Sequence, residues 1–514
     1  MNNSDPDRAS GELDDAVRSG APEAVARTAM ENIWPLFQHH HAALISAVVA
    51  LPEAVLDRYP VLRLLHPVTP VLARTTHPFK PLVYPETARE LSREELDITL
   101  LAQVIAFRLS GDLAASVTYA DRLDERIGRA PVGASGETDG PRWYLHFQIG
   151  STRLAAGQFS RALADFATAR QLGQLTSQGD AVRMALGRMA LAHAMRGSID
   201  DAQRAITELG RYDVPGAAHV DAALTSEAAA EALIAVERQD PDVDALLERL
   251  EPFDSVEVSW PFALLARARG LIAQQQPEHA LEVVRLADET HPRLHGSFAS
   301  DVIASARISA LAMLGDTAHA RELVDGVRHP GTLTKIAAVR LALHEGRLDA
   351  AEAGLSRLDR DRNLGPGQRS ECLVLSVWAQ FDRSGRLESD VLCRLRRLAE
   401  NRNARRMVGS LPVQVIDAAT VGLAPELRAR FVDDTSGLLF ADVDSRPMLT
   451  KGELRVLNAI AQYPTTAAIA AAHHISPNTV KSHLKSLYRK LGCSTRDEAA
   501  KAGSRLGLLT LDGD

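Results

Sequence analysis

Apolar residues recur at helical spacing along most of the chain, in blocks that are paired across short turns. From about residue 95 to 400, a block ends in a Gly-x-apolar turn, and a second block with a small residue near its start follows. The turns begin at Gly111, Gly157, Gly197, Gly315, Gly346 and Gly385. Glycine can adopt the left-handed conformation that ends a helix. The pattern therefore predicts helical hairpins that bury their apolar faces against one another.

The spacing of these turns is uneven. Successive glycines lie 46, 40, 118, 31 and 39 residues apart, and the long gap is close to three repeats. We expect two degenerate units to fill it, around Gln239-Asp240-Pro241 and Gln275-Gln276-Pro277. The small residues after the turns should let paired helices approach closely; they are Ala162, Ala202, Ala280, Ala320 and Ala351. A non-repeating helical bundle with glycine at its helix ends is the alternative.

The segments around this array follow from composition. Residues 1–20 are polar with few large apolar side chains, which predicts disorder. The pattern over residues 21–94 predicts a helical segment with a proline-rich loop. We assign the array of helical hairpins to residues 95–441. Residues 442–448 are short, charged and without apolar periodicity, so we expect a linker there. Residues 449–514, which we call the head, form the last domain.

The sequence of the head predicts four short helices. Thr450 with Glu453 forms a capping box for the first, and Thr465 caps the second, which ends near His473. Ser476-Pro477 opens the third and Gly492 ends it. The fourth is expected from Thr495 to Gly507.

The third of these helices has two contrasting sides. Val480, Leu484, Leu487 and Leu491 recur at intervals of four, three and four residues, which predicts a buried stripe. Off this stripe lie cations and a small polar residue, with no acid between Ser476 and Gly492; they are Lys481, Ser482, Lys485, Arg489 and Lys490. Such a helix suits the major groove of DNA, although an ordinary amphipathic surface helix shares the stripe.

Charge changes the picture by setting the head apart. The chain of 514 residues has a formal net charge of -8, yet the head has nine Lys/Arg against five Asp/Glu. A basic segment on an acidic chain is expected when one end meets DNA. The 46% apolar and 4% aromatic content favours an all-α fold.

Three other features bear on cell location and chemistry. Three cysteines fit a reducing cytoplasm, and Cys372 and Cys393 are expected as small core residues. No apolar run is long enough to cross a membrane, and the N-terminus lacks the order of a signal peptide. His39, His40 and His41 are adjacent, so they suit a helix end better than a metal site.

The head resembles the LuxR-type helix-turn-helix domain, which also occurs in NarL-like response regulators. The resemblance is carried by Leu449-Thr450, Glu453, Val456-Leu457, Ile469-Ala470, Ile475-Ser476, Thr479-Val480, His483, Leu487-Tyr488, Lys490-Leu491 and Ala499 to Leu509. It implies contacts to base edges from Lys481, Ser482 and Lys485. It also implies phosphate contacts from Thr479, His483 and Lys490, and dimerisation through the fourth helix. Ala468 and His473 depart from the family's usual Glu and Leu.

The array resembles tetratricopeptide repeats and the helical region of MalT-like regulators. The best unit is carried by Ile149, Gly150, Gly157, Phe159, Ala162, Phe166 and Ala169. MalT-like proteins also carry an ATPase with a Gly-x-x-x-x-Gly-Lys-Ser/Thr loop, which this sequence lacks. The expected fold is therefore an all-α, TPR-like helical repeat superhelix followed by a four-helix LuxR-type domain.

These observations predict a cytoplasmic, sequence-specific transcriptional regulator. It would bind double-stranded DNA as a homodimer and work with RNA polymerase, while the repeats receive a protein, peptide or small-molecule ligand. No nucleophile motif, metal spacing or phosphate loop is present, so we expect neither an enzyme nor a cofactor. The alternative is a TPR-like interaction scaffold whose helix-turn-helix does not bind DNA.

Overall fold

The protein is helical throughout the part that the structure describes. The computed structural model describes residues 5–66, 93–128, 141–176, 178–250, 258–291, 298–421, 423–438, 451–473, 475–491, 493, 495, 496 and 498–500. These residues form helices and no strand, which confirms the all-α expectation. In the described residues no helix has the length and apolarity that a bilayer crossing requires.

Contacts between Cα atoms divide the chain into two compact units. Unit 1 comprises Met1–Arg267, Arg285–Ile303 and Asn363–Arg369. Unit 2 comprises Ala268–Val284, Ala304–Arg362 and Ser370–Asp514. The domain limits expected from composition stay a prediction, and the expected linker at 442–448 lies outside the described residues.

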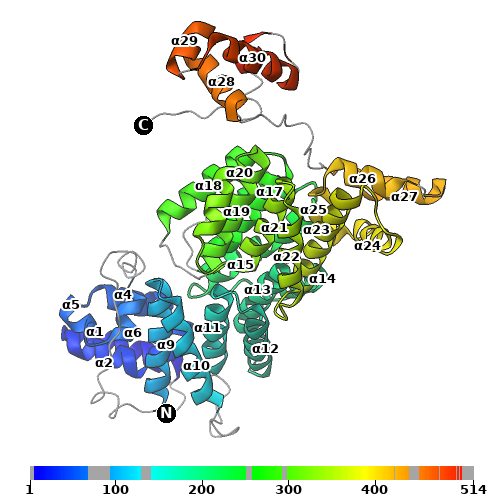
Figure 1. The fold of residues 1–514 in the computed structure, drawn as a ribbon. Coiled ribbons are helices and arrows are strands. Elements are labelled where there is room, and N and C mark those ends of the chain that lie inside the picture. Colours follow the sequence, from blue (N-terminus) through cyan, green and yellow to red (C-terminus); the bar gives the residue numbers. More distant parts are fainter. Residues whose placement is uncertain are drawn as a thin grey trace. The chain divides into compact units, whose positions relative to one another are not determined.

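Six short helices open unit 1 and share one apolar core, drawn in blue in Figure 1. They are α1 (Pro6–Ser19), α2 (Pro22–Glu31), α3 (Ile33–His39), α4 (His41–Val49), α5 (Glu53–Leu56) and α6 (Pro60–Leu65). His40 separates α3 from α4, so the three histidines do mark a helix end. The expected proline-rich loop lies outside the described residues.

The disorder predicted for residues 1–20 is wrong for residues 6–19. Asp5 caps α1 by accepting from the backbone N–H of Asp7, and Gly20 ends the helix in the left-handed conformation. Ala9, Leu13 and Ala16 are buried at intervals of four and three residues. The polar composition concealed this stripe, which needs only three apolar positions once α2, α3 and α4 pack against it.

The array follows as helices joined in pairs. Within unit 1 these are α9 (Arg93–Leu109), α10 (Leu113–Gly128), α11 (Arg142–Ala155), α12 (Phe159–Leu175), α13 (Gly179–Arg196), α14 (Ile199–Leu209), α15 (Val220–Arg238) and α16 (Val243–Glu248). Both units take residues from α17 (Trp260–Ala273), α18 (Pro277–Thr290), α19 (Phe298–Leu314) and α23 (Pro366–Ser384).

The remaining helices belong to unit 2. The helices before the head are α20 (Thr317–Gly326), α21 (Thr332–His344), α22 (Leu348–Asp359), α24 (Ser389–Ala399), η2 (Arg402–Ala404), α25 (Arg405–Gly409), α26 (Val413–Thr420) and α27 (Pro425–Asp434). Cys393 on α24 is exposed, so its expected place in the core is wrong, while Cys372 is half-buried.

The turns that pair the array helices have the predicted backbone. All six glycines named from the sequence have φ between +66° and +85°. Both degenerate units use glutamine at the same position, with φ of 51° at Gln239 and 61° at Gln275. These two are the non-glycine residues with positive φ in the described chain. The turn position therefore imposes the left-handed conformation even where its residue pays a steric cost for it.

Small residues allow the paired helices to approach closely. The five alanines that follow the turns are all 0% exposed. In α11, a Cβ on Gly150 would lie 2.8 Å from Phe166 Cε1 in α12. Any residue other than glycine at this position would therefore force the phenyl ring to move. This packing agrees with helical hairpins, while the kinship with tetratricopeptide repeats stays a prediction.

One close approach in unit 1 joins residues far apart in the sequence. A Cβ on Gly197, at the turn between α13 and α14, would lie 2.3 Å from the Cα of Gly367 in α23. A Cβ on Gly365 would lie 2.5 Å from the carbonyl oxygen of Arg196. The two backbones are therefore in direct contact, and we call this the glycine contact.

Candidate nucleic-acid interface

Three helices of the head pack around their own apolar core, shown in orange and red in Figure 1. The first is α28 (Lys451–Gln462), which buries Val456, Leu457, Ala459 and Ile460. Its expected cap, Thr450, lies outside the described residues, and Glu453 is 3% exposed.

The second helix is α29 (Thr466–Ala472), and it begins as expected. The Thr465 hydroxyl accepts from the backbone N–H of Ala468 at 3.1 Å. Ile469 and Ala470 are buried in the common core. His473, at the end of α29, is half-buried with its ring centroid 6.4 Å from that of Tyr463 in an edge-to-face arrangement. His473 thus lies at the helix end rather than in the middle of the core.

The third helix is α30 (Pro477–Leu491), which packs on both α28 and α29. The Ser476 hydroxyl accepts from the backbone N–H of Thr479 at 3.0 Å and lies 2.8 Å from the Thr479 hydroxyl. Val480, Leu484 and Leu487 are buried, as the stripe predicted. The side chain of Leu491 lies outside the described part.

The opposite side of α30 is open to solvent. Lys481, Ser482 and Lys485 are all exposed, and we call them the basic face. Thr479 is also exposed, close to the start of the helix. Arg489 and Lys490 belong to α30, but their side chains lie outside the described part. The structure therefore brings together the three residues that were expected to reach base edges.

His483 is placed differently from the basic face. It is half-buried, and its ring lies against Gly452 in the first turn of α28. A Cβ on Gly452 would lie 2.7 Å from His483 Cε1. Nothing in the sequence pattern pointed to this contact.

Arg496 is a second residue whose role the sequence did not reveal. Its guanidinium donates to the carbonyl oxygens of Ile460 at 2.7 Å, Pro464 at 3.2 Å and Tyr463. These carbonyls lie in and just after the last turn of α28, where a helix has no partners of its own. The Thr495 hydroxyl accepts from the backbone N–H of Glu498, whose carboxylate accepts from the backbone N–H of Thr495. The start of the fourth helix is thereby fixed to α28, and residues beyond 500 lie outside the described part.

Neutral groups complete the described head. Burial raises the pKa of the Tyr488 phenol and of the Cys493 thiol. Both groups therefore stay protonated at pH 7 and add no negative charge to the head.

Outside the head, a cluster of acidic side chains in unit 1 is paired with an arginine. Asp124, His146 and Asp165 have ligand-type atoms within 4.8 Å of one another. The Arg153 guanidinium, however, donates to Asp165 at 2.7 Å and to Asp124 at 2.7 Å. It also donates to Asp121 at 2.8 Å, and burial lowers the pKa of His146 to about 4. This group is an ion-pair network around one buried arginine.

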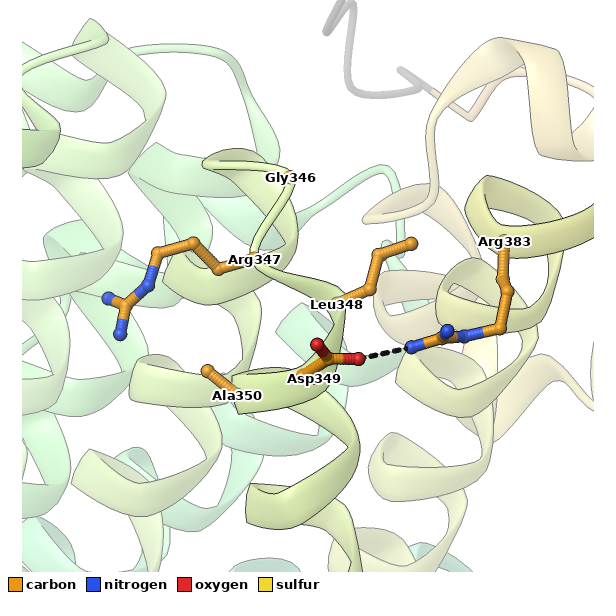
Figure 2. Close-up of a pocket in the computed structure, with 6 residues that line it drawn as sticks. All are labelled: Gly346, Arg347, Leu348, Asp349, Ala350 and Arg383. Atoms are coloured by element: carbon orange, nitrogen blue, oxygen red, sulfur yellow. Dashed lines mark hydrogen bonds and ion pairs between the residues drawn. The ribbon is translucent and has the colours of Figure 1, made fainter.

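A surface depression of about 500 Å³ lies at the start of α22, and Figure 2 shows its lining. Arg383 donates to Asp349 at 2.8 Å and to Glu352 at 2.8 Å. Arg347 donates to Glu345 at 3.1 Å. Both arginines that line the depression are therefore paired with carboxylates of the same chain.

Comparison with known proteins agrees with the geometry of the head. The family described as "Bacterial regulatory proteins, luxR family" matches residues 447–502. The spore germination protein GerE of Bacillus subtilis (strain 168) is 37% identical over 70 residues, which cover 14% of this chain and 95% of GerE. The chain belongs to the luxR family of bacterial regulatory proteins.

Two larger relatives match this luxR-family chain in the same limited way. The transcriptional regulatory protein YdfI of Bacillus subtilis (strain 168) is 45% identical over 64 residues, 12% of this chain and 30% of YdfI. The probable transcriptional regulatory protein NarL of Mycobacterium tuberculosis (strain ATCC 25618 / H37Rv) is 44% identical over 63 residues, 12% of this chain and 29% of NarL. The chain thus spans less than a third of the length of either relative.

Proposed function

We propose that this luxR-family protein is a sequence-specific, DNA-binding transcriptional regulator. The observation that carries the proposal is the basic face of α30. Lys481, Ser482 and Lys485 are exposed on a helix whose other side is held in the head's core. A helix supported in this way can enter the major groove, where ammonium and hydroxyl groups reach base edges.

The phosphate contacts belong to the same proposal. Thr479, at the exposed start of α30, would bind a phosphate of the duplex, and Arg489 and Lys490 would add charge further along the helix. Phosphate contacts fix the register of a protein on DNA, and base contacts supply the sequence preference. The names of YdfI and NarL as regulatory proteins support this assignment.

The rest of the chain is proposed to control the head. The helical array would receive a protein, peptide or small-molecule signal, since stacked hairpins present extended surfaces for binding. We further propose a cytoplasmic homodimer that pairs through the fourth helix and acts together with RNA polymerase. Paired half-sites on the DNA would mirror the symmetry of such a dimer.

Salt dependence of binding tests this function against an interaction scaffold. The affinity of the full chain for a random-sequence duplex should fall steeply as salt is added. Because each phosphate-neutralising cation contributes about 0.9 to the slope of log K against log salt, Lys481→Ala with Lys485→Ala should reduce that slope by up to about 1.8. The matched control is Lys335→Ala, an exposed lysine on α21. Absence of binding at low salt would favour the scaffold.

Control by the array needs a separate test. The head has a core of its own, so it can be compared with the full chain. If the array regulates the head, removal of residues 1–440 should change operator affinity or the transcriptional response. Identical affinity and response in the two proteins would refute a controlling role for the array.

A further inference from the structure

The space that His483 occupies exists because residue 452 has no side chain. His483 lies on α30, and Gly452 lies in the first turn of α28. A Cβ on Gly452 would be 2.7 Å from His483 Cε1, 2.9 Å from Nε2 and 3.3 Å from Nδ1. All these ring atoms are near the same point, so the ring packs onto the backbone of α28 itself. An alanine at 452 would force the ring to move.

Helix geometry directs His483 away from the basic face. Successive residues of an α-helix are about 100° apart, so Lys481 and Lys485 are separated by only about 40°. His483 lies between them in sequence and is therefore about 160° from each around the axis. Its half-buried state agrees with this position, since the lysines are exposed. A side chain on the flank facing α28 is poorly placed to share their target.

Apolar contacts attach α30 to the core of the head. Val480, Leu484 and Leu487 attach the helix to the core through apolar surface, and apolar attraction has little directionality. Groups that read base edges must be held to within about 0.5 Å and 10–20°. A ring that fits against backbone at the flank opposes rolling of α30 on α28.

We infer that His483 is a positioning residue, which rests on the proposed DNA-binding function. Its ring, held in the space left by Gly452, sets the rotation of α30 on α28 and so aims the basic face at the DNA. This role replaces the phosphate contact that the family resemblance implies for His483. It also gives Gly452 a function, because any side chain at that position would displace the ring.

A double-mutant cycle in the full chain tests the contact. Binding of Gly452→Ala, His483→Ala and the double variant to a short random-sequence duplex would be measured by fluorescence anisotropy at several salt concentrations. Each single variant should weaken binding on the order of threefold to tenfold, as coupled neighbours do. The double variant should bind no more weakly than His483→Ala. Losses that multiply would overturn the inference.

The control for the glycine substitution is Gly11→Ala. Gly11 lies inside α1 with no atom within 4 Å of its Cβ position, so this variant should bind DNA like the unmodified chain. Alanine also favours a helix over glycine by about 0.5–1 kcal/mol. A loss of affinity in Gly452→Ala therefore cannot come from a weaker α28.

His483→Phe separates positioning from phosphate contact. Phenylalanine keeps a ring of similar size but has no charge or hydrogen-bond donor. If the ring positions α30, this variant should retain affinity and salt slope, with a pH dependence parallel to that of the unmodified chain. A phosphate contact made by the imidazole nitrogens would instead be lost in His483→Phe, which would then bind more weakly than the unmodified chain. That outcome would refute positioning.

Two outcomes distinguish this inference from the proposed function beneath it. If the unmodified chain fails to bind duplex DNA at low salt, the proposed function and the role of His483 fail together. If the unmodified chain binds and the losses of Gly452→Ala and His483→Ala multiply, only the role of His483 fails. Amide hydrogen exchange across α28 and α30 shows that each variant is folded.

Discussion

The glycine contact between Gly197 and Gly367 can be tested by adding one methyl group. Gly197→Ala places a Cβ 2.3 Å from the Cα and 2.6 Å from the backbone nitrogen of Gly367. The same substitution at Gly157 meets only Phe298 Cβ, at 3.8 Å. Both glycines have nearly equal φ, 73° and 74°. Gly157→Ala is therefore a matched control that carries the left-handed strain without the steric conflict.

The expected costs follow from these two terms. A non-glycine residue in the left-handed region costs about 1–2 kcal/mol, which should be the whole effect of Gly157→Ala. Overpacking against a well-packed neighbour costs about 1–3 kcal/mol more, because backbone atoms cannot swing aside as a side chain can. Gly197→Ala should therefore lower the free energy of unfolding by about 2–5 kcal/mol. Gly367→Ala, without positive φ, should show the packing cost alone.

The assay is urea unfolding followed by tryptophan fluorescence in a Trp378→Phe background. The three remaining tryptophans, Trp34, Trp143 and Trp260, all belong to unit 1, as do the substituted glycines. Each variant is compared with that background at constant m-value. If Gly197→Ala and Gly157→Ala destabilise unit 1 equally, within about 0.5 kcal/mol, the close approach has no energetic weight and the reasoning is wrong.

Three further predictions concern single side chains. Gln239→Gly should stabilise unit 1 by about 0.5 kcal/mol, because relief of left-handed strain outweighs the added entropy of the unfolded chain. The control is Gln174→Gly in α12, where the backbone is right-handed, and this variant should destabilise unit 1. Burial among aromatic rings lowers the pKa of His219 to about 4, from an ordinary 6.5. The protein has the full stability that this neutral histidine allows above about pH 6.5, and it loses up to about 3 kcal/mol of it as the pH falls toward 4. The free energy of unfolding of His219→Phe should fall less over that range. Equal pH profiles for the two proteins would show that His219 is not the cause of the loss. Arg496→Ala should speed amide hydrogen exchange in α28, because the carbonyls at its end lose about 1–2 kcal/mol of hydrogen bonding; exchange unchanged from that of Lys481→Ala would show that water replaces the guanidinium.

The sequence predicted the local structure of the turns well because the backbone itself demands it. A left-handed residue after a helix can be recognised in a sequence when it is glycine, and all six named glycines have positive φ. Gln239 and Gln275 could be placed only from the spacing of the units around them. The burial of Val480, Leu484 and Leu487 could also be predicted from the sequence, since one side of a helix must be apolar to pack.

The misses have a common physical reason: they depend on contacts between distant residues. The stripe of α1 became informative only with the helices that cover it, so composition wrongly predicted disorder there. Arg496 was counted as a cation of the DNA-binding head, yet it donates to carbonyls at the end of α28. The contact of His483 with Gly452 needs the angle between two helices, which no periodicity contains.

Mapping of bound sites across a genome tests the central claim most directly. The full chain, its Lys481→Ala/Lys485→Ala variant and the Lys335→Ala control would be crosslinked to DNA in cells and their bound fragments sequenced. The unmodified chain and the control should occupy the same discrete sites near promoters, and the double variant should lose them. Absence of sites for the unmodified chain, or unchanged occupancy by the double variant, would contradict DNA recognition through the basic face of α30.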